Sequence, residues 1–285
     1  MAEQPRLAPP RTAHRATRYA QRATLTALLL FTAFPFYWAI VASLTPEATL
    51  FQRPSLWPET LILEHYRALF DERDFWVPIR NSLVVAGTTT LFCVTVGALA
   101  AYALARTEFR GKGVILAFIL AVTMFPQISI VSPLYMLLRA LRLINTYPGL
   151  VLPYLTFAMP LAVWLLVGFF RQLPADLEEA ALVDGATRWQ SFTKVILPLA
   201  VPGLATTAIL TFIYCWNEFL FALSFTLGPE RQTVPVAIAL FRGQYQVPWG
   251  QILAASVVAT APVAAIVLVF QRRIVQGLTA GAVKG

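Results

Sequence analysis

The segment LPADLEEAALVDGATRWQSFTKVILP, residues 173–198, separates two long apolar stretches and has the pattern of a short capped helix followed by a second one. Pro174 can occupy the first turn of a helix, where its missing N–H costs nothing, and the acidic residues after it favour the positive end of the helix dipole. Gly185 stands where a left-handed stop is expected, because a residue with a Cβ loses about 1–2 kcal/mol there. The segment therefore predicts a short rigid helix with a turn behind it.

The chain as a whole is too apolar for a water-soluble fold. Of its 285 residues, 58% are hydrophobic and 13% are charged, and the mean hydropathy is +0.67. A membrane-spanning helix needs about 20 apolar residues, because the hydrocarbon core is about 30 Å thick. Continuous apolar runs favour helices over a barrel. We therefore expect an all-α integral membrane protein with six transmembrane helices, at residues 23–44, 82–105, 114–138, 147–170, 201–223 and 252–270.

The distribution of basic residues predicts the orientation of these spans. Fourteen of the 22 Lys and Arg residues, including all three lysines, lie in the four segments that fall on one side of the membrane. Basic residues are enriched on the cytoplasmic side, so both termini and the segment quoted above are expected there. The cations flank the spans without forming a basic face, which argues against nucleic-acid binding. The four segments are 1–22, 106–112, 171–199 and 271–285.

Four parts are expected along the chain. They are a cytoplasmic tail (1–22), a first transmembrane helix with an external segment (23–80), a core of five helices (81–271) that includes the cytoplasmic loop 171–199, and a C-terminal tail (272–285). One short amphipathic helix is expected at 61–70 within the external segment. Prolines inside the spans should bend them and can leave a central cavity. These are Pro126, Pro133, Pro153, Pro160 and Pro262.

The chain carries no evident catalytic or metal-binding motif. It has no Gly-x-x-x-x-Gly-Lys-Ser/Thr loop, so it cannot supply its own ATP site. The His-Glu-x-x-His and Gly-x-Ser-x-Gly patterns are absent as well. Cys93 and Cys215 fall inside predicted spans, where a thiol is a small apolar filler. We therefore expect no catalytic residue and no metal ligand.

Glu218 is the only acidic residue in a predicted span. Carboxylates inside a membrane are costly, which favours a functional role, although a hydrogen bond between helices explains Glu218 equally well. Asn217 is expected to line the same polar strip. In the segment between the last two spans, Gln244 and Tyr245 offer amide and aromatic side chains for ligand or protein contact; an ordinary outer loop is the alternative.

The spacing of Glu179-Ala180-Ala181, Gly185, Val195 and Leu197-Pro198 resembles the EAA loop of binding-protein-dependent ABC importers, with Val195 where the family usually has isoleucine. The resemblance implies a type I ABC importer transmembrane domain in a bacterial or archaeal cytoplasmic membrane, with this loop docked on the ATPase. The coupling residues that it implies are Glu178, Glu179, Ala180, Ala181, Asp184, Gly185, Leu197 and Pro198.

The C-terminal residues 271–285 resemble the tail of the smaller permease subunit of maltose- and trehalose-type importers. The resemblance implies that the tail contacts the ATPase, whereas composition alone would favour a free tail. The residues concerned are Gly277, Leu278, Thr279, Gly281 and Lys284.

The same resemblance implies the partners: a second, larger permease, a homodimeric ABC ATPase that holds ATP and Mg²⁺, an extracytoplasmic solute-binding protein and membrane lipid. No cofactor is implied for this chain itself. The implied substrate is a di- or oligosaccharide such as maltose or trehalose. A self-sufficient secondary transporter or channel for a small polar solute is the alternative, and it would need paired ionisable residues or an ion filter in the spans, which offer only Glu218.

Overall fold

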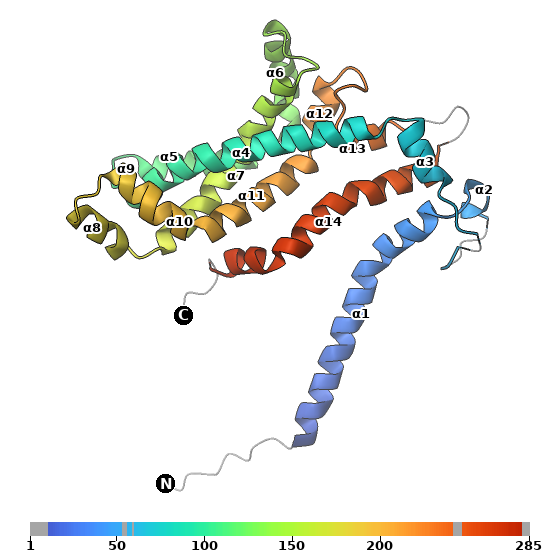
Figure 1. The fold of residues 1–285 in the computed structure, drawn as a ribbon, viewed down its shortest axis with the longest axis horizontal. Coiled ribbons are helices and arrows are strands. Elements are labelled where there is room, and N and C mark those ends of the chain that lie inside the picture. Colours follow the sequence, from blue (N-terminus) through green and yellow to red (C-terminus); the bar gives the residue numbers. More distant parts are fainter. Residues whose placement is uncertain (1–10, 53–55, 59, 242–246, 281–285) are drawn as a thin grey trace. The chain divides into compact units, whose positions relative to one another are not determined.

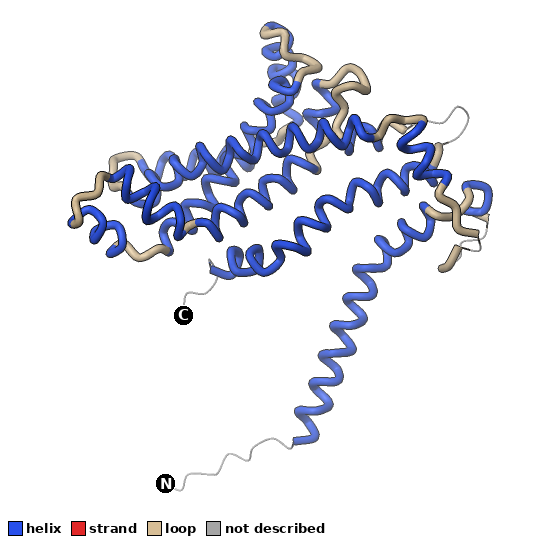
Figure 2. The backbone as a smooth tube through the Cα atoms, viewed as in Figure 1, coloured by secondary structure: helices blue, strands red, loops and turns tan. Residues whose placement is uncertain are grey.

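The computed structural model describes residues 11–52, 56–58, 60–241 and 247–280, with side chains from Arg18 to Gln271. All regular structure in these ranges is helical (Figures 1 and 2). The chain forms two compact units, Met1–Leu69 with Val247–Val257 and Phe70–Gln246 with Val258–Gly285. Within the described residues, four helices are long and apolar enough to cross a membrane, and the number rises to six if each of two sharply bent helix pairs is one span. The prediction of an all-α membrane protein is confirmed.

The first unit contains α1 (Arg11–Ser43), α2 (Glu47–Leu50), most of α3 (Glu64–Asp71) and the start of α14 (Trp249–Ala280). Helix α1 begins inside the segment predicted as a tail. Helix α3 overlaps the predicted amphipathic helix 61–70 and begins three residues later than predicted. The carboxylate of Glu47 accepts hydrogen bonds from the backbone N–H groups of Trp249 and Gly250, both at 2.9 Å. Glu47 thereby caps α14, because the first N–H groups of a helix have no partner inside it.

The core of the second unit lies between α4 (Trp76–Arg106), α7 (Tyr147–Gln172) and α11 (Val201–Trp216), which run side by side (Figure 1). Small residues are fully buried on these helices, including Ala86 and Ala101 on α4 and Ala158 and Ala162 on α7. Small side chains let helix backbones approach closely, which is how membrane helices gain packing energy without a hydrophobic driving force. This core is the frame that positions the loops at both ends.

Buried polar side chains fasten the loop after α12 (Leu220–Phe225) to α4 and α7. The amide of Asn81 donates to the carbonyls of Glu230 (3.0 Å) and Gln232 (2.9 Å), and it accepts from the hydroxyl of Tyr147 at 2.7 Å. Asn145 donates to the exposed carboxylate of Glu230 at 2.6 Å, and this bond lowers the pKa of that group. We call the Asn81 bonds the Asn81 network. It holds this end of α4 in a fixed relation to the loop.

The third predicted span, 114–138, is not one helix. It is broken into α5 (Lys112–Met124) and α6 (Ile128–Ala140), which meet at 97°. Pro126 lies in the break; it has no N–H to donate, and it forces Phe125 into an extended conformation with ψ 131°. Pro133, Pro153 and Pro160 lie inside continuous helices. A proline inside an apolar segment is therefore not sufficient to break its helix.

The fifth predicted span, 201–223, is also wrong beyond its start. Helix α11 ends at Trp216, residues 217–219 leave the helix, and α12 follows, with α13 (Val234–Ala239) after the loop. Before α11, the helical turns α9 (Arg188–Ser191), η1 (Phe192–Ile196) and α10 (Leu197–Leu199) form a rod that meets α11 at 72°. Helix α14 extends past both ends of its predicted span and continues to Ala280, within the predicted C-terminal tail.

Candidate functional site

Helix α8 (Asp176–Val183) has the predicted left-handed stop. Gly185 has φ +86°, its N–H bonds the carbonyl of Leu182 at 3.1 Å, and the N–H of Ala186 bonds the carbonyl of Ala181 at 3.0 Å. These two bonds define a Schellman motif, which satisfies carbonyls at the end of a helix. The start of α8 carries Asp176, Glu178 and Glu179, as the dipole favours. The predicted stop at Gly185 is confirmed, whereas Pro174 lies before the N-cap Ala175 and not in the first turn of α8.

The rod after α8 begins with a capping box and ends at a proline. Gln190 N–H bonds the hydroxyl of Thr187 at 3.2 Å, and the side chain of Gln190 accepts from the N–H of Thr187 at 2.9 Å. The turn η1 is π-helical and directly precedes Leu197-Pro198. The ring of Pro198 would crowd the carbonyl of Lys194 in a regular helix, and a wider turn relieves this contact. The rod is therefore fixed in direction at both ends.

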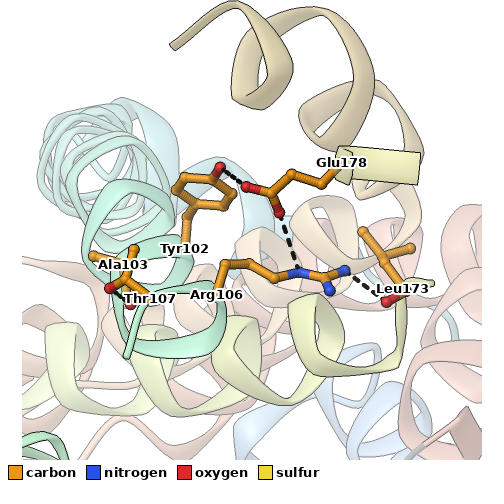
Figure 3. A network of polar contacts seen from close by, with 6 residues as sticks. All are labelled: Tyr102, Ala103, Arg106, Thr107, Leu173 and Glu178. Carbon is orange, nitrogen blue, oxygen red and sulfur yellow. Dashed lines mark hydrogen bonds and ion pairs between the residues drawn. The ribbon is translucent and has the colours of Figure 1, made fainter. Parts of the chain in front are cut away.

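A polar clamp joins α8 to the end of α4 (Figure 3). The hydroxyl of Tyr102 donates to Glu178 Oε1 at 2.5 Å, and Arg106 Nε lies 3.9 Å from Glu178 Oε2. Arg106 Nη2 also donates to the carbonyl of Leu173, just before α8, at 2.6 Å. The Arg106 and Glu178 side chains are only 9% and 16% exposed, so water screens their attraction less than at an open surface. We call these three side chains the Glu178 clamp.

An aromatic cluster supports the clamp from the side. The ring of Phe192 lies 4.6 Å from Tyr102, 5.7 Å from Trp189 and 6.4 Å from Phe170, measured between centroids. Phe192 and Phe170 are buried among residues of α4 and α7. Such pairs contribute about 0.5–1.5 kcal/mol each beyond their buried area. The segment from α8 to η1 is therefore attached to both long helices.

The opposite face of α8 is exposed, and the predicted coupling residues divide between the two faces. Glu179, Ala180, Asp184 and Gly185 are exposed, whereas Glu178 is turned toward α4 and Ala181 is half-buried. Leu197 packs against the core between α4 and α7, and Pro198 is exposed where the rod meets α11. Leu182 and Val183 add an apolar surface, with Val183 87% exposed. Sequence reasoning missed Tyr102 and Arg106, because their partner Glu178 lies more than 70 residues away.

The predicted pathway residues Asn217 and Glu218 lie in the break between α11 and α12. Glu218 is 7% exposed, and its two carboxylate oxygens accept from the N–H groups of Phe221 (2.8 Å) and Ala222 (3.1 Å). These bonds cap the start of α12, and the buried hydroxyl of Tyr154 on α7 lies within reach of the same carboxylate. Asn217 is exposed and borders a hollow of about 410 Å³.

The other predicted contact residues lie at or beyond the limits of the described chain. Gln244 and Tyr245 fall outside the described residues, as do Gly281 and Lys284. Gly277, Leu278 and Thr279 belong to the last turns of α14, where the backbone alone is described.

The described residues form several apolar helices, two sharply bent helix pairs and an exposed capped helix fastened to the core, which together define a multi-pass membrane protein. The family model for binding-protein-dependent transport system inner membrane components matches residues 93–280. The chain belongs to this family, which is a transport family.

Relatives match along nearly the whole chain. The trehalose transport system permease protein SugB of Mycobacterium tuberculosis is 48% identical over 96% of this chain and 99% of that protein. The trehalose/maltose transport system permease protein MalG of Thermococcus litoralis is 45% identical over 88% of this chain and 91% of that protein. A solved bacterial ABC transporter involved in alginate import has the same fold, with a TM-score of 0.78 over 94% of this chain and 99% of that chain, at 22% identity.

Proposed function

We propose that the chain is the smaller permease subunit of an ATP-driven importer for a di- or oligosaccharide such as maltose or trehalose. Its partners would be a larger permease, a homodimeric ATPase and an extracytoplasmic solute-binding protein. Relatives at 48% and 45% identity are named for trehalose and trehalose/maltose transport. A solved alginate transporter of this fold is in complex with a periplasmic protein that binds an alginate pentasaccharide.

The exposed face of α8 carries the proposal. Glu179, Ala180 and Asp184 lie beside Leu182 and Val183, so acidic groups border a small apolar surface. A surface of this kind suits a cleft that has apolar walls and basic residues at its rim. A Cβ built on Gly185 would meet no atom within 4 Å, so the chain leaves open space there for a partner. We assign this face to the ATPase.

The Glu178 clamp supports a coupling role for the same helix. Energy passes between sites through contiguous packed or hydrogen-bonded elements that move as a unit. Because α8 is bonded to α4 and the rod after it packs on α4 and α7, a shift of α8 must displace these helices or break the clamp. ATP and Mg²⁺ would bind in the partner subunits, since this chain has no phosphate loop.

The orientation of this arrangement follows from the charge distribution. With the segment 171–199 in the cytoplasm, α8 faces the compartment that holds ATP, and both termini lie on the same side. The described part of α14 would bring residues 277–280 toward the ATPase, together with the tail that follows.

A self-sufficient secondary transporter is the competing reading. It would need an ionisable side chain that binds and releases a coupling ion within the spans. Glu218 has both oxygens bonded to backbone N–H groups, which leaves it a structural task. Family membership favours the importer as well.

The purified chain alone should neither bind nor hydrolyse ATP, and its complex with the ATPase should do both, with hydrolysis stimulated by sugar-loaded binding protein. Deletion of residues 277–285 should weaken this stimulation more than it weakens assembly, because α8 still holds the ATPase. Basal and stimulated ATP hydrolysis are measured in the same lipid for the complex with the intact chain and for the complex with the truncated chain. Uptake of trehalose by the isolated chain, driven by a proton or sodium gradient, would overturn the proposal.

A further inference from the structure

Two helix breaks in the second unit border one hollow. The α5–α6 break contributes Gln127, and the α11–α12 break contributes Asn217, Glu218 and Phe219. A hydrogen bond of 2.6 Å from Gln127 Nε2 to the hydroxyl of Tyr214 joins the two sides. Ile213 and Leu220 complete the lining. Irregular backbone at membrane depth is tolerated where it lines a cavity or lies inside protein. The hollow between the two breaks has a mainly apolar lining with a few polar side chains, which is consistent with a passage for solute.

The polar groups of the hollow have unused hydrogen-bonding capacity. Asn217 donates one N–H to the carbonyl of Ile213 at 2.8 Å, and its Oδ1 has no partner within the described residues. The Oε1 of Gln127 likewise has no partner in that part of the chain, and the Tyr214 hydroxyl accepts from Gln127 with its own proton left to donate. Two amide oxygens and a hydroxyl donor suit the hydroxyl groups of a sugar. Phe219, 38% exposed, offers an apolar face for the sugar C–H groups.

The charge of the hollow restricts the ligand. No Lys or Arg is among its lining residues. Glu218 is the only charged residue there, and it holds α12 through its bonds to Phe221 and Ala222. An anionic ligand would meet a negative charge with no cation to offset it, which disfavours binding in a site of low dielectric. The volume of about 410 Å³ lies within the range of about 300–1,000 Å³ that small-molecule sites occupy.

We propose that this hollow is a sugar-binding subsite of the permease itself, selective for an uncharged sugar residue. Gln127, Tyr214 and Asn217 bind its hydroxyl groups, Phe219 packs on its ring, and Glu218 is a positioning residue that shapes the break and disfavours acidic sugars. The inference rests on the proposed function for the direction of transport, whereas binding in the hollow can be measured without transport.

The first experiment measures binding directly in the assembled complex. Ile213→Cys places a thiol in the lining while keeping every polar group, and the native Cys93 and Cys215 are buried and give little background. A water-soluble thiol reagent should label this variant, in the presence and absence of ATP. Trehalose should slow the labelling about tenfold, whereas sulfoquinovosyl glycerol, an acidic sugar, should not. Unchanged labelling with trehalose overturns the subsite, and equal protection by both sugars overturns the selectivity for uncharged sugars.

The second experiment measures trehalose uptake at a concentration below saturation. Gln127→Ala and Asn217→Ala should each lower uptake about tenfold, the effect of losing roughly 1.4 kcal/mol of binding. The matched control is Thr156→Ala, which removes an exposed hydroxyl of α7 that bonds only its own helix. Each variant should co-purify with the ATPase as the wild type does, which shows that the variants assemble. Wild-type uptake by both alanine variants overturns the subsite alone, whereas absence of sugar uptake by the wild-type complex refutes the proposed function.

Discussion

Glu178→Ala should loosen α8 from α4 and reduce the sugar transported per ATP. The substitution removes the 2.5 Å bond from Tyr102 and the 3.9 Å pairing with Arg106, and it leaves the Arg106 charge largely shielded from water. A hydrogen bond to a charged group is worth about 1.5–3 kcal/mol, and breaking one partner of a buried ion pair costs about 3–5 kcal/mol. Arg106 keeps its bond to the Leu173 carbonyl, so we take the lower end, about 3 kcal/mol in total.

A loss of about 3 kcal/mol raises the population of released α8 by roughly two orders of magnitude. Hydrogen exchange of the α8 amides, measured by mass spectrometry on the assembled complex, should accelerate accordingly. ATP hydrolysis should persist while uptake falls. Glu178→Gln keeps an acceptor for Tyr102 and should show a smaller effect on both measurements.

Asp176→Ala is the matched control, because Asp176 is an exposed acid in the same first turn and makes no bond to α4 among the described residues. It should leave exchange and uptake close to wild type. If Glu178→Ala exchanges at the wild-type rate and keeps wild-type transport per ATP, the clamp does not position α8 and the coupling argument fails.

Three further predictions follow from the same contacts. Gly185→Ala should lower the stability of the α8 turn by only about 1 kcal/mol, because the added Cβ meets no atom and the cost comes from holding alanine at φ +86°. Gly185→Trp should abolish co-purification of the ATPase, and retained ATPase with normal uptake would contradict the docking assignment. Asn81→Asp should lower the Tm of the purified complex more than Asn81→Ala does, because an anion would face two carbonyl oxygens where an amide now donates, and the opposite order would contradict this account of the Asn81 network. A topology reporter inserted after Glu72 should report the outside and one after Thr187 the cytoplasm; an external Thr187 would remove α8 from the ATPase.

Local signals in the sequence predicted α8 well. The left-handed turn at Gly185 depends on residues within one helical turn of it, and its Schellman bonds lie where the prediction placed the stop. The direction of Glu178 was missed because it depends on Tyr102 and Arg106, which are distant in sequence. A pattern read along one segment contains no information on which side will be covered by another helix.

Hydropathy located the spans and failed on their continuity. It measures how well a segment tolerates lipid, and the apolar residues on either side of each break outweigh the few polar residues within it. Pro126 marks one break, yet Pro153 and Pro160 leave α7 intact, so the packing of neighbouring helices decides the outcome. Glu218 was singled out in the sequence as a carboxylate within a span, whereas its role as a cap depends on the fold of residues 217–222.

Helix α4 carries the Asn81 network near its start and the Glu178 clamp at its end, with no proline after its first turn. At 1.5 Å per residue, Asn81 and Arg106 are roughly 37 Å apart along one stiff element. Such an element is a lever arm: a tilt of about 10° at one end displaces the other by about 6 Å, by simple geometry from the helical rise. A tilt of this size imposed on α4 at α8 would therefore displace the 226–233 loop by a distance comparable to the width of a sugar ring.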